Sequence, residues 1–172
     1  DLTQYFMTDV PIARESVIDS ALLVLHDWSH FITLDPKEID AERGVIQEEL
    51  RTSETASWRA QIKMIKALGK GTLYEDRNLI GYLDGLASFT YDDIREFYHK
   101  WYRPDYQTVV VVGDIDVDKV EQKIKTIMAD IPAPAADAAK KDVIVVPDNA
   151  EPIVSVNADP EMQQSNLMIF YK

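Results

Sequence analysis

Apolar residues recur every three or four positions in several stretches of the chain, which is the spacing that places them on one face of an α-helix. Four helices are predicted in this way, over 11–31, over 36–68, over 91–101 and from Asp116 onward. Asp35-Pro36 is a typical start signal for the long helix, and Thr90 can cap the next one with Asp93 at its third position. Gly44 inside the long helix indicates close packing or a functional role, because glycine weakens a helix interior.

Other stretches are rich in β-branched and aromatic residues and predict β-strands. These strand-like stretches are 1–6, 108–114, 143–146, 153–156 and 166–172. Together with the helices they predict an α+β fold, in which helices pack on one face of a mostly antiparallel sheet in a two-layer sandwich. Because the first and last residues fall inside strand-like runs, we expect the chain to be truncated at both ends.

Composition excludes several classes of function. The chain has 18 basic and 30 acidic residues, for a net charge of −12, which disfavours binding to nucleic acids. It has no cysteine, so neither a disulfide framework nor a thiolate metal site can form. No apolar run reaches the length of a membrane-spanning helix, and no membrane insertion is predicted.

The most informative segment is Ala41–Arg51, which reads Ala-Glu-Arg-Gly-Val-Ile-Gln-Glu-Glu-Leu-Arg. On a helix, Glu42 and Glu49 lie two turns apart and within roughly 20° of one another. The apolar residues around them place both carboxylates in the middle of the apolar stripe, whereas Glu48 points away from it. A carboxylate that faces a core must be paired, protonated or bound to a metal, because its unpaired burial costs several kcal/mol.

Spacing alone leaves two interpretations of this pair open. Each glutamate can pair with a buried arginine or cap a neighbouring helix, which is the commoner arrangement. Alternatively, one of them binds a metal ion and the other orients a histidine ligand, as zinc sites often require.

The three histidines are weaker candidates for chemistry. His26 and His30 have the i, i+4 spacing of a helical zinc pair, but the glutamate that follows the first histidine in that motif is missing. A structural role at a helix end is the preferred interpretation for both, and packing is preferred for His99. Gly113-Asp114 after the valine run lacks the remaining residues of a phosphate-binding loop.

The pattern Glu-Arg-x-Val-Ile-x-x-Glu resembles the downstream half of the active site in the pitrilysin/insulinase family of zinc metallopeptidases. Further similarities occur in the same order along the chain. They are Asp1-x-Thr3-x-Tyr5, Tyr74–Gly81, Phe89–Asp105, Val109–Asp116 and Asp159-Pro160-Glu161. The bacterial single-chain or periplasmic branch of the family is the most similar one.

The resemblance implies roles for the two glutamates. Glu49 corresponds to the third zinc ligand and Glu42 to the carboxylate that holds a ligand histidine. The family's His-x-x-Glu-His motif, which supplies two ligands and the general base, is absent from these 172 residues. The resemblance also implies three parts: residues 1–131 as the C-terminal part of the zinc-bearing domain, a linker over 132–142, and residues 143–172 as its closing strand and the start of the next domain.

The family therefore implies a zinc-dependent peptidase that hydrolyses extended peptides between two homologous halves. The expected compartment is the periplasm or cell envelope of a bacterium, with the cytoplasm as the second choice. The chain alone is expected to be inactive and to lack bound zinc, and its open strand edges favour self-association. The alternative is a non-catalytic homologue that binds substrate or builds an assembly. The retained pair Glu42 and Glu49 argues against that alternative.

Overall fold

The computed structural model describes residues 2–171, so Asp1 and Lys172, which belong to the predicted terminal strands, lie outside the described residues. The chain forms two compact units. The first unit contains the described residues up to Asp35 together with Thr90–Ala139, and the second contains Pro36–Phe89 with the described residues from Lys140 onward. The predicted division of the chain at residues 131 and 142 remains a prediction.

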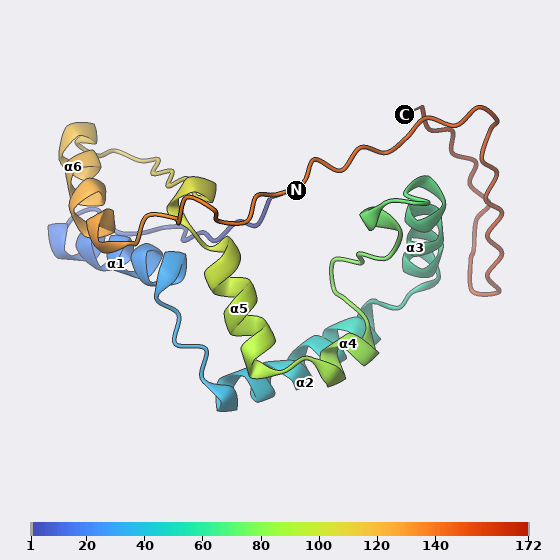
Figure 1. The fold of residues 1–172 in the computed structure, drawn as a ribbon, viewed down its shortest axis with the longest axis horizontal. Helices are drawn as coiled ribbons and strands as arrows, with labels where there is room; N and C mark the ends of the chain where they lie inside the picture. Colours follow the sequence, from blue (N-terminus) through green and yellow to red (C-terminus); the bar gives the residue numbers. More distant parts are fainter. Residues whose placement is uncertain (1, 172) are drawn as a thin grey trace. The chain divides into compact units, whose positions relative to one another are not determined.

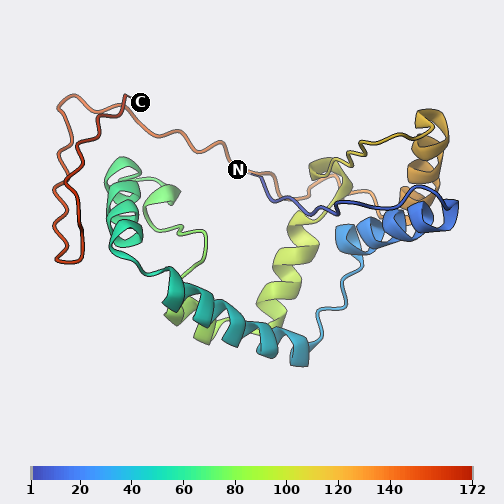
Figure 2. The ribbon, with the colours of Figure 1, turned by 180° about the vertical axis from the view of Figure 1, so that it is seen from behind.

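Six α-helices and three short 3₁₀ turns make up the regular structure of residues 2–171 (Figures 1 and 2). The first unit holds α1 (Glu15–His30), α5 (Tyr91–Trp101), η2 (Pro104–Tyr106), α6 (Val117–Ile127) and η3 (Met128–Asp130). The second unit holds α2 (Pro36–Ser53), α3 (Ala56–Leu68), η1 (Leu73–Glu75) and α4 (Leu83–Ser88).

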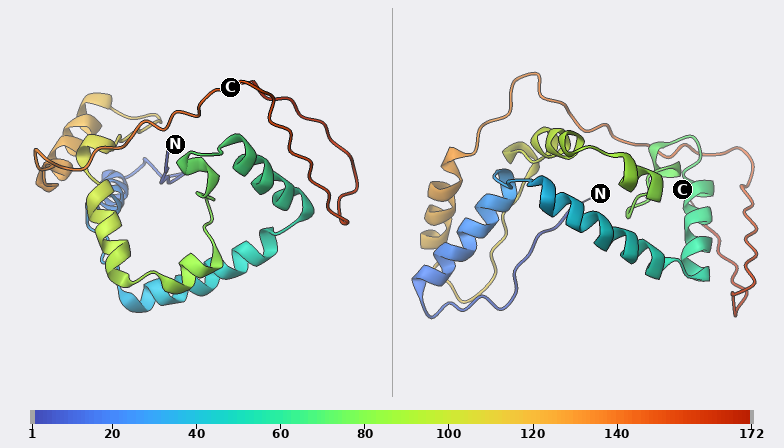
Figure 3. Two further views of the ribbon diagram at one scale, coloured as in Figure 1. Left: turned by 45° about the vertical axis from the view of Figure 1, so that its right-hand side comes forward. Right: turned by 90° about the horizontal axis from the view of Figure 1, so that it is seen from below.

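The predicted α+β fold is wrong for the described residues, which contain no β-strand. The valine run at 108–112 is extended but exposed, with Val112 91% accessible, and the apolar residues of the last segment are exposed as well. A strand exists only when its backbone hydrogen bonds reach a neighbouring strand, and these segments have no such partner within residues 2–171. Near the C-terminal end two extended arms run side by side without forming a ladder (Figures 1 and 3).

The helix predictions agree better with the structure. Thr90 and Asp93 form the predicted capping box: the Asp93 carboxylate accepts from the Thr90 amide at 2.7 Å, and the Asp93 amide donates to the Thr90 hydroxyl at 3.2 Å. The long helix predicted over 36–68 is instead two helices, α2 and α3. The polar run before α3 explains the break, because Thr55 caps α3 by accepting from the Trp58 amide.

In the first unit, α1 packs against α6, and polar contacts join them to the remaining elements. The buried Tyr98 hydroxyl of α5 donates to the Trp28 carbonyl of α1 at 2.9 Å. The His26 ring, only 8% accessible, is hydrogen-bonded through Nδ1 to Asp27 and through Nε2 to Asp130, both at 2.9 Å. Burial opposes the charged form of His26, but the two carboxylates outweigh it and raise the pKa of the ring.

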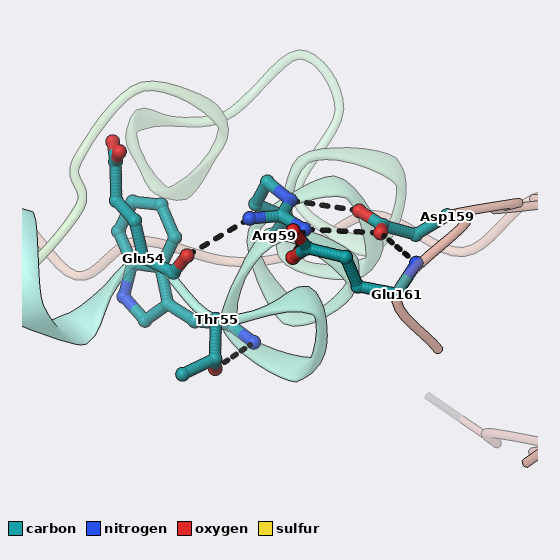
Figure 4. A network of polar contacts seen from close by, with 6 residues as sticks. Glu54, Thr55, Arg59, Asp159 and Glu161 are labelled. Atoms are coloured by element: carbon teal, nitrogen blue, oxygen red, sulfur yellow. Dashed lines mark hydrogen bonds and ion pairs between the residues drawn. The ribbon is translucent and has the colours of Figure 1, made fainter. Parts of the chain in front are cut away.

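In the second unit, α2 lies beside α4 and α3 contacts η1, as both views of Figure 3 show for the first pair. The C-terminal segment reaches α3 through Arg59, whose guanidinium donates to both oxygens of Asp159 at 2.7 and 3.0 Å and to Glu161 at 2.6 Å (Figure 4). It also donates to the Glu54 carbonyl at 2.8 Å. The bond from Arg59 and the amide of Glu161 lower the pKa of Asp159 to about 2.

Gly44 has open space around it, which contradicts the predicted close packing: a Cβ added there would meet no atom within 4 Å. We therefore expect Gly44→Ala to raise the free energy of unfolding by about 0.5–1 kcal/mol, because alanine costs less backbone entropy in a helix. Chemical denaturation followed by circular dichroism measures it. Gly69→Ala is the contrasting variant, since its Cβ would lie 2.9 Å from Tyr74 Cβ, and it should destabilise the chain.

The raised pKa of His26 predicts a pH-dependent stability of the first unit. A raised pKa means that the native state binds the proton more tightly than the unfolded chain. The stabilisation is complete below pH about 6.5, the ordinary value for histidine, and is lost as pH rises through the higher pKa of the folded state. His26→Gln should remove this part of the pH dependence of the unfolding free energy, whereas a variant of the exposed His99 should keep it.

Asp159→Asn should free the C-terminal segment from α3, because the amide cannot form the charged bidentate pair with Arg59. We expect faster proteolysis after residue 140 and faster amide exchange at 159–163, with α3 itself unchanged. Asp148→Asn, in an exposed position of the same segment, is the control. Since the pKa of Asp159 is lowered, its contribution is present above pH about 3.8 and is lost as pH falls through about 2. Equal proteolysis of both variants would show that Arg59 does not hold the segment.

Candidate functional site

Helix α2 carries both candidate glutamates and presents two different faces. Its inner face is formed by residues spaced three and four apart, of which Ile39 and Leu50 are buried and Arg43 and Ile46 are half-buried. A second face, formed by Glu42, Val45 and Glu49, is exposed, with Val45 58% accessible.

The predicted position of the glutamates in the middle of the buried stripe is wrong for the described residues. Glu42 and Glu49 are both exposed, at the edge of the stripe. On a helical projection the stripe centres between Ile39 and Leu50, roughly 70–90° away from the two glutamates. The stem of Arg43 occupies the stripe position between Ile39 and Ile46. Val45 is apolar but exposed, and counting it with its buried neighbours shifts the predicted stripe toward the glutamates.

The carboxylates of Glu42 and Glu49 have no hydrogen-bond or ion-pair partner among residues 2–171, in contrast to their neighbour Glu48. The guanidinium of Arg51 donates to both oxygens of Glu48, at 2.8 and 2.5 Å. This bond lowers the pKa of Glu48. Glutamates of the same helix thus differ in chemistry. The charge of Glu48 is paired with Arg51, whereas the carboxylates of Glu42 and Glu49 are available to bind a cation or a hydrogen-bond donor.

Arg43 holds α2 in place from the inner face. Its guanidinium donates to the carbonyl of Leu86 in α4 and, at 2.6 Å, to the carbonyl of Phe89. It lies over the Phe89 ring at 3.6 Å from the centroid, and its Nε donates to Asp40 at 3.2 Å. This role of Arg43 is not among the sequence predictions. The available signal was an arginine at an inward position of the helix, three and four residues from apolar ones.

A catalytic zinc ion in a peptidase requires three protein ligands. Within residues 2–171 no group of three or more histidine, aspartate or glutamate side chains is placed to hold a metal ion. The exposed carboxylate of Glu49 has the chemistry of one such ligand, and the carboxylate of Glu42 on the same face has the chemistry of an acceptor for a ligand histidine. The α2 face therefore fits part of a zinc site.

The structure does not bring the other candidates together as a metal site. His26 is engaged by Asp27 and Asp130, and His30 Nδ1 lies 3.0 Å from the Tyr102 carbonyl oxygen. The ring of His99 lies 6.0 Å from that of His30, without a third ligand. The preference for structural roles at positions 26 and 30 agrees with these contacts. Among the described helices, none combines the length and apolar character needed to cross a bilayer.

The chain is similar to known proteins of one family. Residues 88–172 match the family model described as the peptidase M16 inactive domain. The chain is 31% identical over 169 residues to the probable zinc protease PqqL of Escherichia coli. This alignment covers 97% of the chain and 18% of that protein. The chain is 38% identical over 112 residues to the probable zinc protease PqqL of Haemophilus influenzae, covering 65% of the chain and 12% of that protein.

A solved structure shows the same relationship. The crystal structure of the first half of the periplasmic protease PqqL from Escherichia coli superposes with a TM-score of 0.71 at 35% identity, covering 82% of this chain and 29% of that one. The chain thus spans less than a fifth of the length of the curated relatives named above. Together the family model, the relatives and the superposition confirm the predicted resemblance: the chain belongs to the peptidase M16 family, the pitrilysin/insulinase family of zinc metallopeptidases.

Proposed function

We propose that this chain carries part of the zinc centre of a metalloendopeptidase, in which Glu49 is a zinc ligand and Glu42 orients a ligand histidine. The observation that carries the proposal is the exposed face of α2, where two carboxylates two turns apart have no partner within the described residues while the adjacent Glu48 is paired with Arg51. The relatives are named as zinc proteases, which supports a zinc ion in the full-length protein.

Bound zinc supplies a Lewis acid that activates water and polarises a carbonyl group. The residues of this chain supply less than the whole reaction. Glu49 gives one anionic oxygen, and Glu42 accepts a hydrogen bond from the imidazole that it holds, which fixes the tautomer of that ligand. The chain has three histidines and none stands in a His-x-x-Glu-His motif. Two ligands and the general base therefore come from outside these 172 residues, and the chain alone is inactive.

The proposed substrate is an extended peptide, bound by backbone hydrogen bonds to a strand edge in the full-length protein. The strand-like segments of this chain support this mode, because they are extended and leave apolar residues such as Val112 and Leu167 exposed. The second homologous half of the same protein is the proposed partner that closes over the peptide. The periplasm is the proposed compartment, since the superposed structure is that of a periplasmic protease.

A second function within the family is a non-catalytic module that binds substrate or builds an assembly. One observation favours it, namely the match of residues 88–172 to a model described as an inactive domain. Helix α2, with Glu42 and Glu49, lies outside that match. Zinc content discriminates the two functions, because a binding module has no need of a metal at this face.

The test is the zinc content and peptide hydrolysis of the full-length protein that contains this sequence. Glu49→Ala should reduce zinc from about one ion per chain to none and lower the hydrolysis rate by at least a factor on the order of 100, because a zinc ligand is lost. Glu48→Ala is the matched control: it lies next in the chain, is exposed and breaks only a surface pair with Arg51, so zinc and rate should stay within about twofold. Equal effects of the two variants would contradict the assignment.

A further inference from the structure

The contacts of Arg43 suggest a role beyond stability. This residue follows Glu42 in sequence, yet its side chain lies on the inner face of α2. There it contacts Leu86 in α4 and Phe89 just after α4. Arg43 is the polar residue of this face, which otherwise consists of Ile39, Ile46 and Leu50, and 18% of its side chain is accessible. Its three nitrogens all have acceptors: Leu86, Phe89 and Asp40.

Apart from Arg43, the residues of the inner face of α2 are apolar. Two of its apolar side chains are buried, Ile39 and Leu50, and they lie at opposite ends of the segment that carries the glutamates. The hydrophobic effect itself is not directional, so these two contacts specify the rotation of α2 less sharply than hydrogen bonds do. The two carbonyls bound by Arg43 are directional acceptors, and they lie between these ends at the level of Glu42.

The consequence of a roll is large at the glutamates. Side-chain groups lie about 5–6 Å from a helix axis, so a roll of about 20° moves them by about 2 Å. A zinc–oxygen bond is about 2.0–2.2 Å long, and productive sites are held to within about 0.5 Å. In the proposed zinc centre, a contact that prevents such a roll would therefore decide whether Glu49 reaches the metal.

Lysine at this position would not provide the same restraint. The guanidinium is planar and reaches two carbonyls at once while stacking on Phe89, whereas an ammonium is a point donor without a plane to stack. The orientation of α2 thus depends on the shape of the arginine group and not on its charge alone.

We propose that Arg43 is a positioning residue for the zinc centre: by binding the carbonyls of Leu86 and Phe89 it fixes the rotation of α2 that presents Glu42 and Glu49 to the metal. The inference rests on the function proposed above. It assigns Arg43 no contact with zinc or substrate.

The test compares Arg43→Ala and Arg43→Lys with wild type in the full-length protein, by zinc dissociation constant, by kcat and KM for a reporter peptide, and by melting temperature. We expect zinc binding about 10–100-fold weaker in Arg43→Ala, with kcat at saturating zinc lowered and KM within about twofold. Arg43→Lys should restore the melting temperature better than it restores kcat. Arg51→Ala is the matched control on the same helix, because its guanidinium binds only the exposed Glu48.

A folded Arg43→Ala protein with wild-type zinc affinity and kcat, at a lower melting temperature, would overturn the inference and leave Arg43 a structural residue. If Arg43→Ala does not fold, Arg43→Lys decides: wild-type affinity and kcat in that variant would also overturn it. Glu49→Ala measured in parallel separates the two proposals. Zinc retained in Glu49→Ala refutes the proposed function, whereas zinc lost in Glu49→Ala but unchanged in the Arg43 variants refutes only the positioning role.

Discussion

The regular elements of residues 2–171 are helical, and their backbone hydrogen bonds close mainly within each helix. A helix satisfies its amides four residues away, whereas a strand needs a second strand at its side. The described residues contain the helices, and the strand-like segments among them stay extended with their apolar side chains exposed. This constraint determines the architecture: short helices are joined by side-chain contacts, and no sheet organises them.

Because no sheet gathers the helices within residues 2–171, two arginine groups with several acceptors join elements of the second unit. Arg43 connects α2 to the segment after α4, and Arg59 connects α3 to Asp159 and Glu161. In the first unit, Tyr98 and His26 have the corresponding role, through Trp28 and Asp130. Each is a group with a fixed geometry, so it sets an orientation as well as a distance. Helix α2, which carries the candidate glutamates, has such a contact through Arg43.

Most of the helical residues could be predicted from the sequence, because periodicity and capping are local properties, but α4 lies outside the predicted helices. The capping box of Thr90 and Asp93 and the helix that starts after Asp116 both follow from residues close in the chain. Local signals could not show that the predicted sheet is absent from the described residues. Runs of β-branched residues indicate a preference for strands but not the presence of a partner strand. The break between α2 and α3 was missed because Thr55 acts as a cap only in competition with a continuous helix.

The candidate site shows the same limit in a finer form. The spacing of Glu42 and Glu49 predicts that both lie in a buried stripe, and this burial is wrong. The two glutamates nevertheless share one face of α2. They differ from Glu48, which is paired with Arg51, in having no partner for their carboxylates within the described residues, and sequence spacing does not contain this contrast. An exposed, unpaired pair of carboxylates costs a soluble surface nothing and would be unremarkable alone. Under the proposed function the pair gains meaning from Arg43, because its contacts with Phe89 restrain the helix that carries the two carboxylates.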